Sequence, residues 1–219
     1  MIIEVKGVEF SNKGAELMLL SILQMLDLEF AEYDLVLSPG HLLPYQKRAE
    51  LGAWQKLSFQ LWGLDWTWLG NLAPAGLRRL LRHFGIVVEK DIDVVLDASG
   101  FVYSDDWGSH CLQQTLSQLK RMKKYNARYV FLPQAFGPFH NPKNRRLMQQ
   151  LIEHAGLLLA RDEQSFCSLK EIDISDTPEK IKYSPDFTPL LEPKAISASL
   201  DLPDNYVCII PNNRLFERA

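Results

Sequence analysis

The chain has 219 residues, of which 47% are hydrophobic, with 24 basic and 27 acidic side chains and a formal net charge of −3. This composition predicts a full hydrophobic core, and the slight negative charge excludes a general attraction to nucleic acid. No run reaches the roughly 20 apolar residues of a membrane span, and the N-terminus lacks a signal-peptide pattern. The three cysteines are widely spaced and form no metal motif. We therefore expect a cytoplasmic protein with no bound metal, whose thiols are reduced and packed as small hydrophobic side chains.

Apolar strand-like runs alternate with amphipathic helical segments along the chain. This alternation is typical of an α/β fold, Rossmann-like, with a mostly parallel sheet and helices on both faces. The predicted strands are Ile2–Lys6, Tyr33–Ser38, Asp93–Asp97, Arg128–Pro133, Leu157–Arg161 and Ile181–Tyr183.

Helices are expected between these strands. The segment Asn12–Leu26 is apolar nearly all round, which predicts heavy burial. Ser109 is expected to cap a second helix, and Asn141 a third that begins at Pro142. Residues 1–191 are expected to form one domain and the polar, proline-bearing residues 192–205 a linker. Residues 206–219 would then be the first strand of a second, missing domain or an added strand of the first.

Polar and glycine residues follow several predicted strands, and ligands bind at the carboxyl edge of an open parallel sheet. After the first strand, Asn12 and Gly14 could form an anion or hydroxyl site, although a simple helix cap explains them equally well. After the third strand, Ser99 and Gly100 would allow close approach to the backbone. Asp105 could supply a carboxylate there, or be an ordinary solvated loop acid.

The run Pro133-Gln-Ala-Phe-Gly-Pro-Phe139 carries Gln134 to the end of the fourth strand, where it could contact a ligand or tie two loops together. Arg161 ends the next strand, where a guanidinium pairs with a carboxylate or binds an anion. Asp162 resembles a helix cap. The sequence contains no P-loop, nucleophile elbow or paired-cysteine motif, so spacing alone names no reaction.

Aromatic residues concentrate just before a basic amphipathic segment, Pro74–Phe84. This composition is typical of a membrane-surface element, so residues 54–84 are a candidate for peripheral membrane contact. An insertion folded against its own domain or a partner is the alternative. The aromatic residues are Trp54, Phe59, Trp62, Trp66 and Trp68.

Taken in order, the junctions resemble the polysaccharide pyruvyl transferase family across nearly the whole chain. The motifs are Asn12-Lys-Gly14, Asp97–Gly100, Pro133–Phe139, Ala160-Arg-Asp-Glu-Gln-Ser165 and Ser184-Pro-Asp186. The resemblance implies the N-terminal, acceptor-side domain of a GT-B fold. It also implies transfer of a pyruvyl group from phosphoenolpyruvate, a donor substrate rather than a cofactor, to a sugar of a bacterial surface polysaccharide. On this interpretation Asp105 and Arg161 are the candidate catalytic residues. The candidate substrate-binding residues are Asn12, Gly14, Glu16, Ser99, Gly100, Gln134, Gly137 and Asp162.

The chain departs from the family pattern at two places. It has Ala15 and Glu16 where members often have an acid directly after the first glycine, and Ala98-Ser99-Gly100 where they often have a glycine-rich triplet. The basic donor-binding residues and the acid/base histidine of the family's second half have no counterpart, so activity is expected only if a second domain completes the chain. A lipid-linked glycan acceptor at the inner face of the plasma membrane is the expected partner, and an oligomer is compatible with the sequence. The alternatives are half of a GT-B glycosyltransferase that uses a nucleotide-sugar donor, or a non-catalytic glycan-binding or assembly module.

Overall fold

A computed structural model describes residues 1–61, 64–174, 178–192 and 205–207. In these residues one sheet of eight parallel strands has the order β10-β9-β8-β7-β1-β2-β3-β6. The strands are β1 (Ile2–Lys6), β2 (Asp34–Leu37), β3 (Trp54–Lys56), β6 (Ile86–Val87), β7 (Val94–Asp97), β8 (Arg128–Gln134), β9 (Leu157–Ala160) and β10 (Ile181–Tyr183). The chain builds outward from β1 to β6, then returns to place β7 on the other side of β1. The predicted Rossmann-like α/β class is confirmed.

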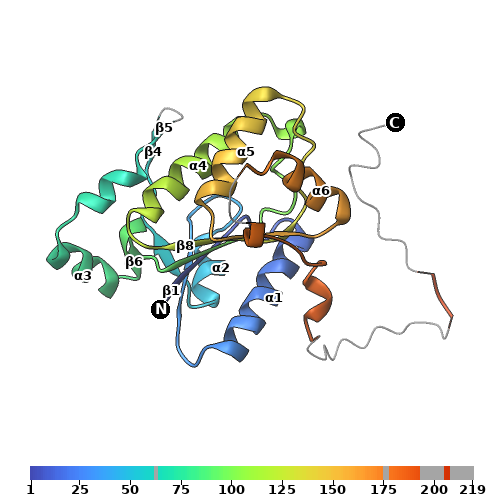
Figure 1. The fold of residues 1–219 in the computed structure, drawn as a ribbon. Helices are drawn as coiled ribbons and strands as arrows, with labels where there is room; N and C mark the ends of the chain where they lie inside the picture. Colours follow the sequence, from blue (N-terminus) through green and yellow to red (C-terminus); the bar gives the residue numbers. More distant parts are fainter. Residues whose placement is uncertain (62–63, 175–177, 193–204, 208–219) are drawn as a thin grey trace.

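Helices cover both faces of the sheet (Figure 1). Alternate residues of a strand contribute to two different hydrophobic cores, because successive side chains point to opposite faces of the sheet. Ile2 and Phe131 belong to the core under α4, α5 and α6, whereas Ile3 and Val5 pack with α1. The helices are α1 (Lys13–Glu29), α2 (Tyr45–Glu50), α3 (Ala75–His83), α4 (His110–Lys123), α5 (Pro142–His154) and α6 (Glu163–Ile172).

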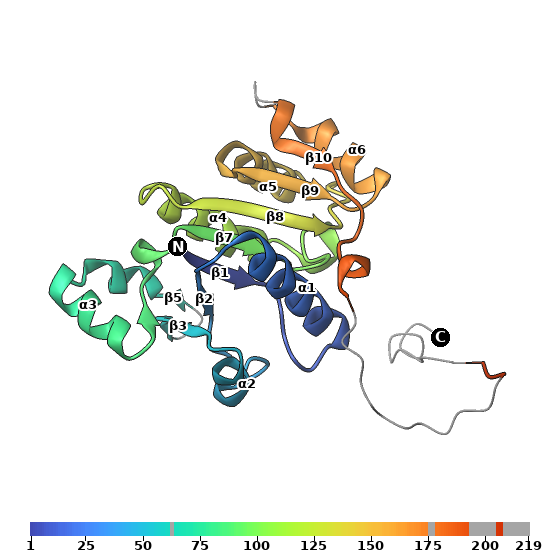
Figure 2. The same ribbon diagram turned by 90° about the horizontal axis from the view of Figure 1, so that it is seen from below.

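The segment between β3 and β6 forms an insertion at one end of the sheet. It contains the short hairpin β4 (Gln60–Leu61) and β5 (Leu64–Asp65), the 3₁₀ helix η1 (Thr67–Leu72) and α3. After β6 comes a second 3₁₀ turn, η2 (Glu89–Asp91). In Figure 2 this insertion lies far from β10 and α6, which occupy the other end of the sheet.

Three predicted helix starts are confirmed by their capping bonds. The side chains of Asn12, Asn141 and Asp162 accept from backbone N–H groups of their own first turns at 3.0, 2.9 and 2.7 Å. Ser109 also stands at the N-cap of α4 but makes no capping bond. Its hydroxyl donates to Asn144 Oδ1 at 2.6 Å instead, which ties α4 to α5.

The predicted heavy burial of Asn12–Leu26 is wrong for one side of α1. Ala15, Leu19, Ile22 and Leu26 are buried against the sheet, while Leu17, Leu20, Met25 and Leu28 are exposed. A helix on the outside of a sheet buries one stripe only, even when its sequence is apolar all round.

The domain division proposed for the C-terminal part is not tested, since 193–204 and 208–219 lie outside the described residues. So do Trp62 and Cys208. At the start of the predicted linker, the N–H of Glu192 donates to Gln24 Oε1 of α1 at 2.9 Å. The expectation that the thiols are packed does not hold for Cys167, which is exposed.

Candidate functional site

The strand order reverses between β1 and β7, and the carboxyl ends of two such strands form the usual ligand crevice of an open α/β sheet. A cavity of about 570 Å³ lies at this position and is called the crevice below. The loops after β1, β7 and β9 and the start of α1 supply most of its wall. The lining residues are Gly7, Val8, Glu9, Asn12, Gly14, Ala15, Leu17, Met18, Ser99, Gly100, Phe101, Val102, Trp107, Cys111, Arg161, Asp186 and Thr188.

The two loops meet at the floor of the crevice. Gly7 has φ +78°, and a Cβ added to it would lie 2.4 Å from Ser99 Cα, so no side chain fits there. Gly100 has φ +79°, a left-handed conformation that glycine adopts without strain. The two loops therefore pack closely against each other, and both glycines line the crevice, Gly7 as an exposed residue and Gly100 as a buried one.

A buried carboxylate fixes the Ser99 loop. Asp97 Oδ1 accepts from the N–H and the hydroxyl of Ser99 at 3.0 and 2.5 Å. Its Oδ2 accepts from the hydroxyls of Tyr103 and Tyr129, both at 2.6 Å. Burial, and then the charge of Asp97, raise the pKa values of both tyrosines well above the usual value, so they remain donors. The sequence placed Asp97 at a strand end and in the Asp97–Gly100 motif but did not predict this anchoring role, although an acid that closes an apolar strand is a signal of it.

The first turn of α1 forms another wall. Asn12 accepts from the N–H of Gly14, which is the predicted helix cap, and both residues also line the crevice. The N-terminus of α1 carries a partial positive charge that favours oxygen ligands. Glu16 does not line the crevice; its carboxylate pairs with Lys13 at 2.5 Å.

Arg161 is the one basic residue among the crevice-lining residues that the structure describes. Its side chain is 35% exposed, and Nε lies 4.0 Å from Asp162 Oδ2, which is a loose contact. Asp162 is occupied elsewhere, because it accepts from the N–H and hydroxyl of Ser165 at 2.7 and 2.9 Å. The Arg161 guanidinium therefore remains available to an anionic group.

Gln134 and Gly137 lie outside the crevice lining. Gln134 is fully buried, and its side-chain amide donates to the carbonyl of Asp97 at 3.3 Å, so it ties β8 to β7. Gly137 has φ +81°, and a Cβ there would come within 2.9 Å of Ser168 on α6. The amide N–H contact fits a tie between the two strands, whereas Gln134 Oε1 is buried with no hydrogen-bond partner among the described residues, so both interpretations of Gln134 stand.

Asp105 also lies outside the crevice lining. Its carboxylate accepts from the N–H groups of His140 and Asn141 at 2.6 and 2.9 Å and from the side chain of Asn144 at 2.8 Å. Burial acts to raise the pKa of Asp105, but these hydrogen bonds outweigh it and hold the pKa below the usual value. The contacts make Asp105 an anchor for the loop that leads into α5.

An apolar part of the crevice wall was not predicted from the sequence. The rings of Phe101 and Trp107 meet edge to face with centroids 5.4 Å apart, and both are partly exposed. Cys111, one of the residues expected to pack in the core, lies beside them, and burial raises the pKa of its thiol. Aromatic rings next to polar backbone suit a ligand with both C–H and hydroxyl groups.

A parallel α/β sheet with a crevice of mixed polar and apolar lining at its switch point defines a Rossmann-like ligand-binding domain. Residues 12–218 match the sequence profile of the polysaccharide pyruvyl transferase family. The chain belongs to this family, as its motifs predicted. A search of curated proteins finds no match. Among the described residues, no helix is long and apolar enough to span a membrane.

Proposed function

We propose that the chain forms the acceptor-side half of a pyruvyl transferase and binds a sugar of a surface polysaccharide in the crevice. The observation that supports this most directly is the combination of crevice-lining glycines, Asn12 and Ser99, an aromatic pair and a single available guanidinium at the switch point of a family member. Hydroxyl groups both donate and accept, so they match such a mixed wall.

The reaction proposed is ketal formation from phosphoenolpyruvate. One sugar hydroxyl adds to the enol carbon as the neighbouring methylene carbon takes a proton. A second hydroxyl then displaces the phosphate, which leaves with the C–O bond electrons, and the methylene becomes the methyl group of a cyclic ketal. Arg161 would pair with the carboxylate or the phosphate of the donor, because guanidinium groups bind such anions in a bidentate manner. Asn12 and Ser99 would orient the sugar hydroxyls.

Donor use separates this proposal from its rivals. The whole protein encoded by the reading frame that contains this chain would be incubated with surface-glycan fragments and either phosphoenolpyruvate or nucleotide sugars. We expect consumption of phosphoenolpyruvate, release of phosphate and a pyruvylated glycan. Consumption of a nucleotide sugar would instead support the glycosyltransferase alternative. Glycan binding without turnover of either donor would support the non-catalytic module.

We also propose that the insertion contacts the inner face of the plasma membrane, where a lipid-linked acceptor would reside. None of the α3 residues is buried, and Phe84 is 74% exposed. Exposed tryptophans beside an apolar helix face favour an interfacial position, and Arg79 is an exposed basic side chain, whereas Arg78 and Arg82 pair with Asp91. The exposed apolar residues of this segment are Phe59, Trp66, Trp68, Leu69, Leu72, Leu77, Leu80 and Phe84.

Vesicle sedimentation tests the membrane contact. The double variant Leu80→Ser/Phe84→Ser should lose most binding to vesicles that contain anionic lipid. Leu28→Ser, at an exposed leucine of α1, is the matched control and should bind normally. Equal binding by both variants would contradict a membrane contact through this segment.

A further inference from the structure

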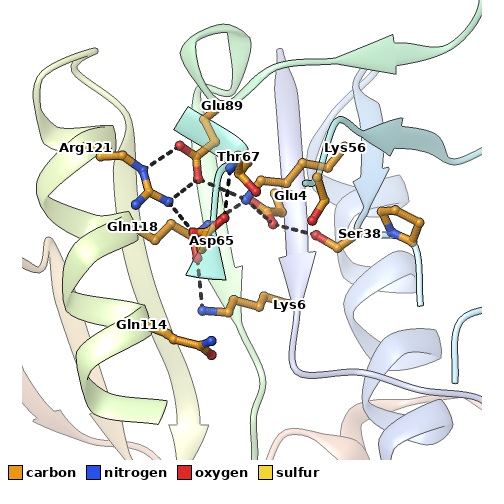
Figure 3. Close-up of a pocket in the computed structure, with 12 residues that line it drawn as sticks. Glu4, Lys6, Ser38, Lys56, Asp65, Thr67, Glu89, Gln114, Gln118 and Arg121 are labelled. Carbon is orange, nitrogen blue, oxygen red and sulfur yellow. Dashed lines mark hydrogen bonds and ion pairs between the residues drawn. The ribbon is translucent and has the colours of Figure 1, made fainter. Parts of the chain in front are cut away.

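A second cavity, of about 390 Å³, lies on the face of the sheet that α4 covers (Figure 3). It is called the polar cavity below. Lys6 lines this cavity and the next residue, Gly7, lines the crevice, so the two adjoin at the end of β1. On α4, Gln114 lines the polar cavity and Cys111, one turn earlier, lines the crevice. The two cavities therefore offer neighbouring positions for one extended ligand.

Lys56 and Arg121 pair with the three carboxylates of the polar cavity. Lys56 Nζ lies 2.9 Å from both carboxylate oxygens of Glu4 and 3.6 Å from Glu89 Oε1. Arg121 donates to both oxygens of Glu89 at 2.8 and 2.9 Å and to Asp65 at 3.0 Å. Burial acts to raise the pKa of Glu89, but Arg121 and Lys56 hold it below the usual value.

Lys6 completes a balanced wall. Its ammonium group donates to three neutral oxygens, those of Thr115, Gln118 and Tyr129, at 3.2, 3.0 and 3.3 Å. Three basic side chains thus face three carboxylates, those of Glu4, Asp65 and Glu89. The charges of the wall therefore sum to zero, which gives no overall attraction to an ionic ligand.

Stability alone does not account for such a wall. Replacing a buried ion pair with well-packed apolar residues is often neutral or stabilising, so fastening the insertion to the sheet does not require buried charges. These side chains border open space, and Gln114, an exposed residue on α4, lines the same cavity. In Figure 3 its side-chain amide lies at one end of the cavity, near Lys6.

We propose that the polar cavity binds a neutral, hydroxyl-rich ring, a second sugar unit beside the one in the crevice. This inference rests on the proposed function. A sugar hydroxyl donates to a carboxylate and accepts from an ammonium or amide, so it matches every group in the wall. The volume is near the lower end of the roughly 300–1,000 Å³ of small-molecule sites, which suits a single ring. No aromatic ring lines the cavity in the described part of the chain, which disfavours a nucleobase.

Side-chain amide signals in two-dimensional NMR test the inference directly. The probes are the neutral methyl glycosides of glucose, galactose, mannose and N-acetylglucosamine. At least one should shift the signals of Gln114 and Gln118 in a saturable manner, and added salt should leave the dissociation constant unchanged because the ligand is neutral. Failure of all four probes to shift these signals, or stronger binding by glucuronate or glucose phosphate, would overturn the inference.

Adjacent glutamines of α4 provide matched variants. Gln114→Trp fills the cavity and should weaken glycoside binding, measured by the shift of the Gln118 amide signal, at least tenfold. Gln113→Trp, at an exposed position that does not line the cavity, should leave it unchanged. Ser58→Phe fills the cavity from a different wall and is the replacement variant if Gln114→Trp lowers the unfolding temperature. Equal binding by the filling and control variants would refute the site.

The outcomes separate this inference from the proposed function. If phosphoenolpyruvate is consumed but Gln114→Trp and Ser58→Phe leave glycoside binding unchanged, only the inference about the polar cavity fails. If those variants abolish glycoside binding but no phosphoenolpyruvate is consumed, the proposed reaction fails and the sugar site stands.

Discussion

Removing the cation at the centre of the polar cavity should cost the fold several kcal/mol. The Lys56 side chain is 6% exposed and that of its partner Glu4 is 1% exposed. Among the described residues, Lys56→Met would leave the buried Glu4 carboxylate only Gln118 and Ser38 as side-chain donors, at 3.2 and 3.3 Å. Breaking a buried pair in this way costs about 3–5 kcal/mol. Because Glu89 keeps Arg121, the lower end of about 3 kcal/mol is expected.

Thermal and urea unfolding measure this cost. A domain of this size loses about 2–4 °C per kcal/mol, so the midpoint of Lys56→Met should fall by about 6–12 °C. The double variant Lys56→Met/Glu4→Gln should regain at least half of the loss, since it removes the unpaired charge. A loss below about 1 kcal/mol for Lys56→Met, or strict additivity in the double variant, would refute the pairing argument.

Three further predictions concern the loops and the ion pairs. Gly7→Ala should destabilise the fold, measured by urea unfolding, because its Cβ would meet Ser99 Cα at 2.4 Å; wild-type stability would contradict the close approach of the loops. Asp105→Asn should lower the free energy of unfolding by about 1 kcal/mol, because the amide accepts more weakly from the N–H groups of His140 and Asn141, and ligand affinity should change little. A large loss of ligand affinity at unchanged stability would instead indicate that Asp105 contacts the ligand. The stability that comes from the lowered pKa of Glu89 should be complete above about pH 4.3 and decline as the pH falls through the folded-state pKa, and Glu89→Gln should flatten this decline in acid unfolding curves.

Most of the strands that were predicted from the sequence have longer apolar runs, although Ile181–Tyr183 is only three residues long. The short strands β3 and β6 were missed because two or three residues carry too little periodicity. The caps Asn12, Asn141 and Asp162 were predictable because a capping bond is local. Ser109 departs from this rule because Asn144, distant in the sequence, competes for its hydroxyl.

The crevice was partly predictable, since strand ends meet at one edge of a parallel sheet. The direction of each side chain was not. The register of β8 against β9 shifts between Phe131 and Gln134, and Gln134 is buried outside the crevice lining. The polar cavity was beyond prediction, because its charges come from segments far apart in the chain. Charged Glu4 inside a strand that is buried on both faces was the available signal.

The central claim is that a sugar reacts in the crevice beside Arg161. Its most direct test is the rate of phosphoenolpyruvate-dependent pyruvylation by the whole protein and its Arg161→Ala variant. Loss of a charged hydrogen bond worth about 1.5–3 kcal/mol predicts a fall in kcat/KM of about 10- to 100-fold. Arg128→Ala, at an exposed arginine that begins β8 at the opposite edge of the sheet, is the control and should leave kcat/KM unchanged. Equal rates for Arg161→Ala and the wild-type protein would contradict the account.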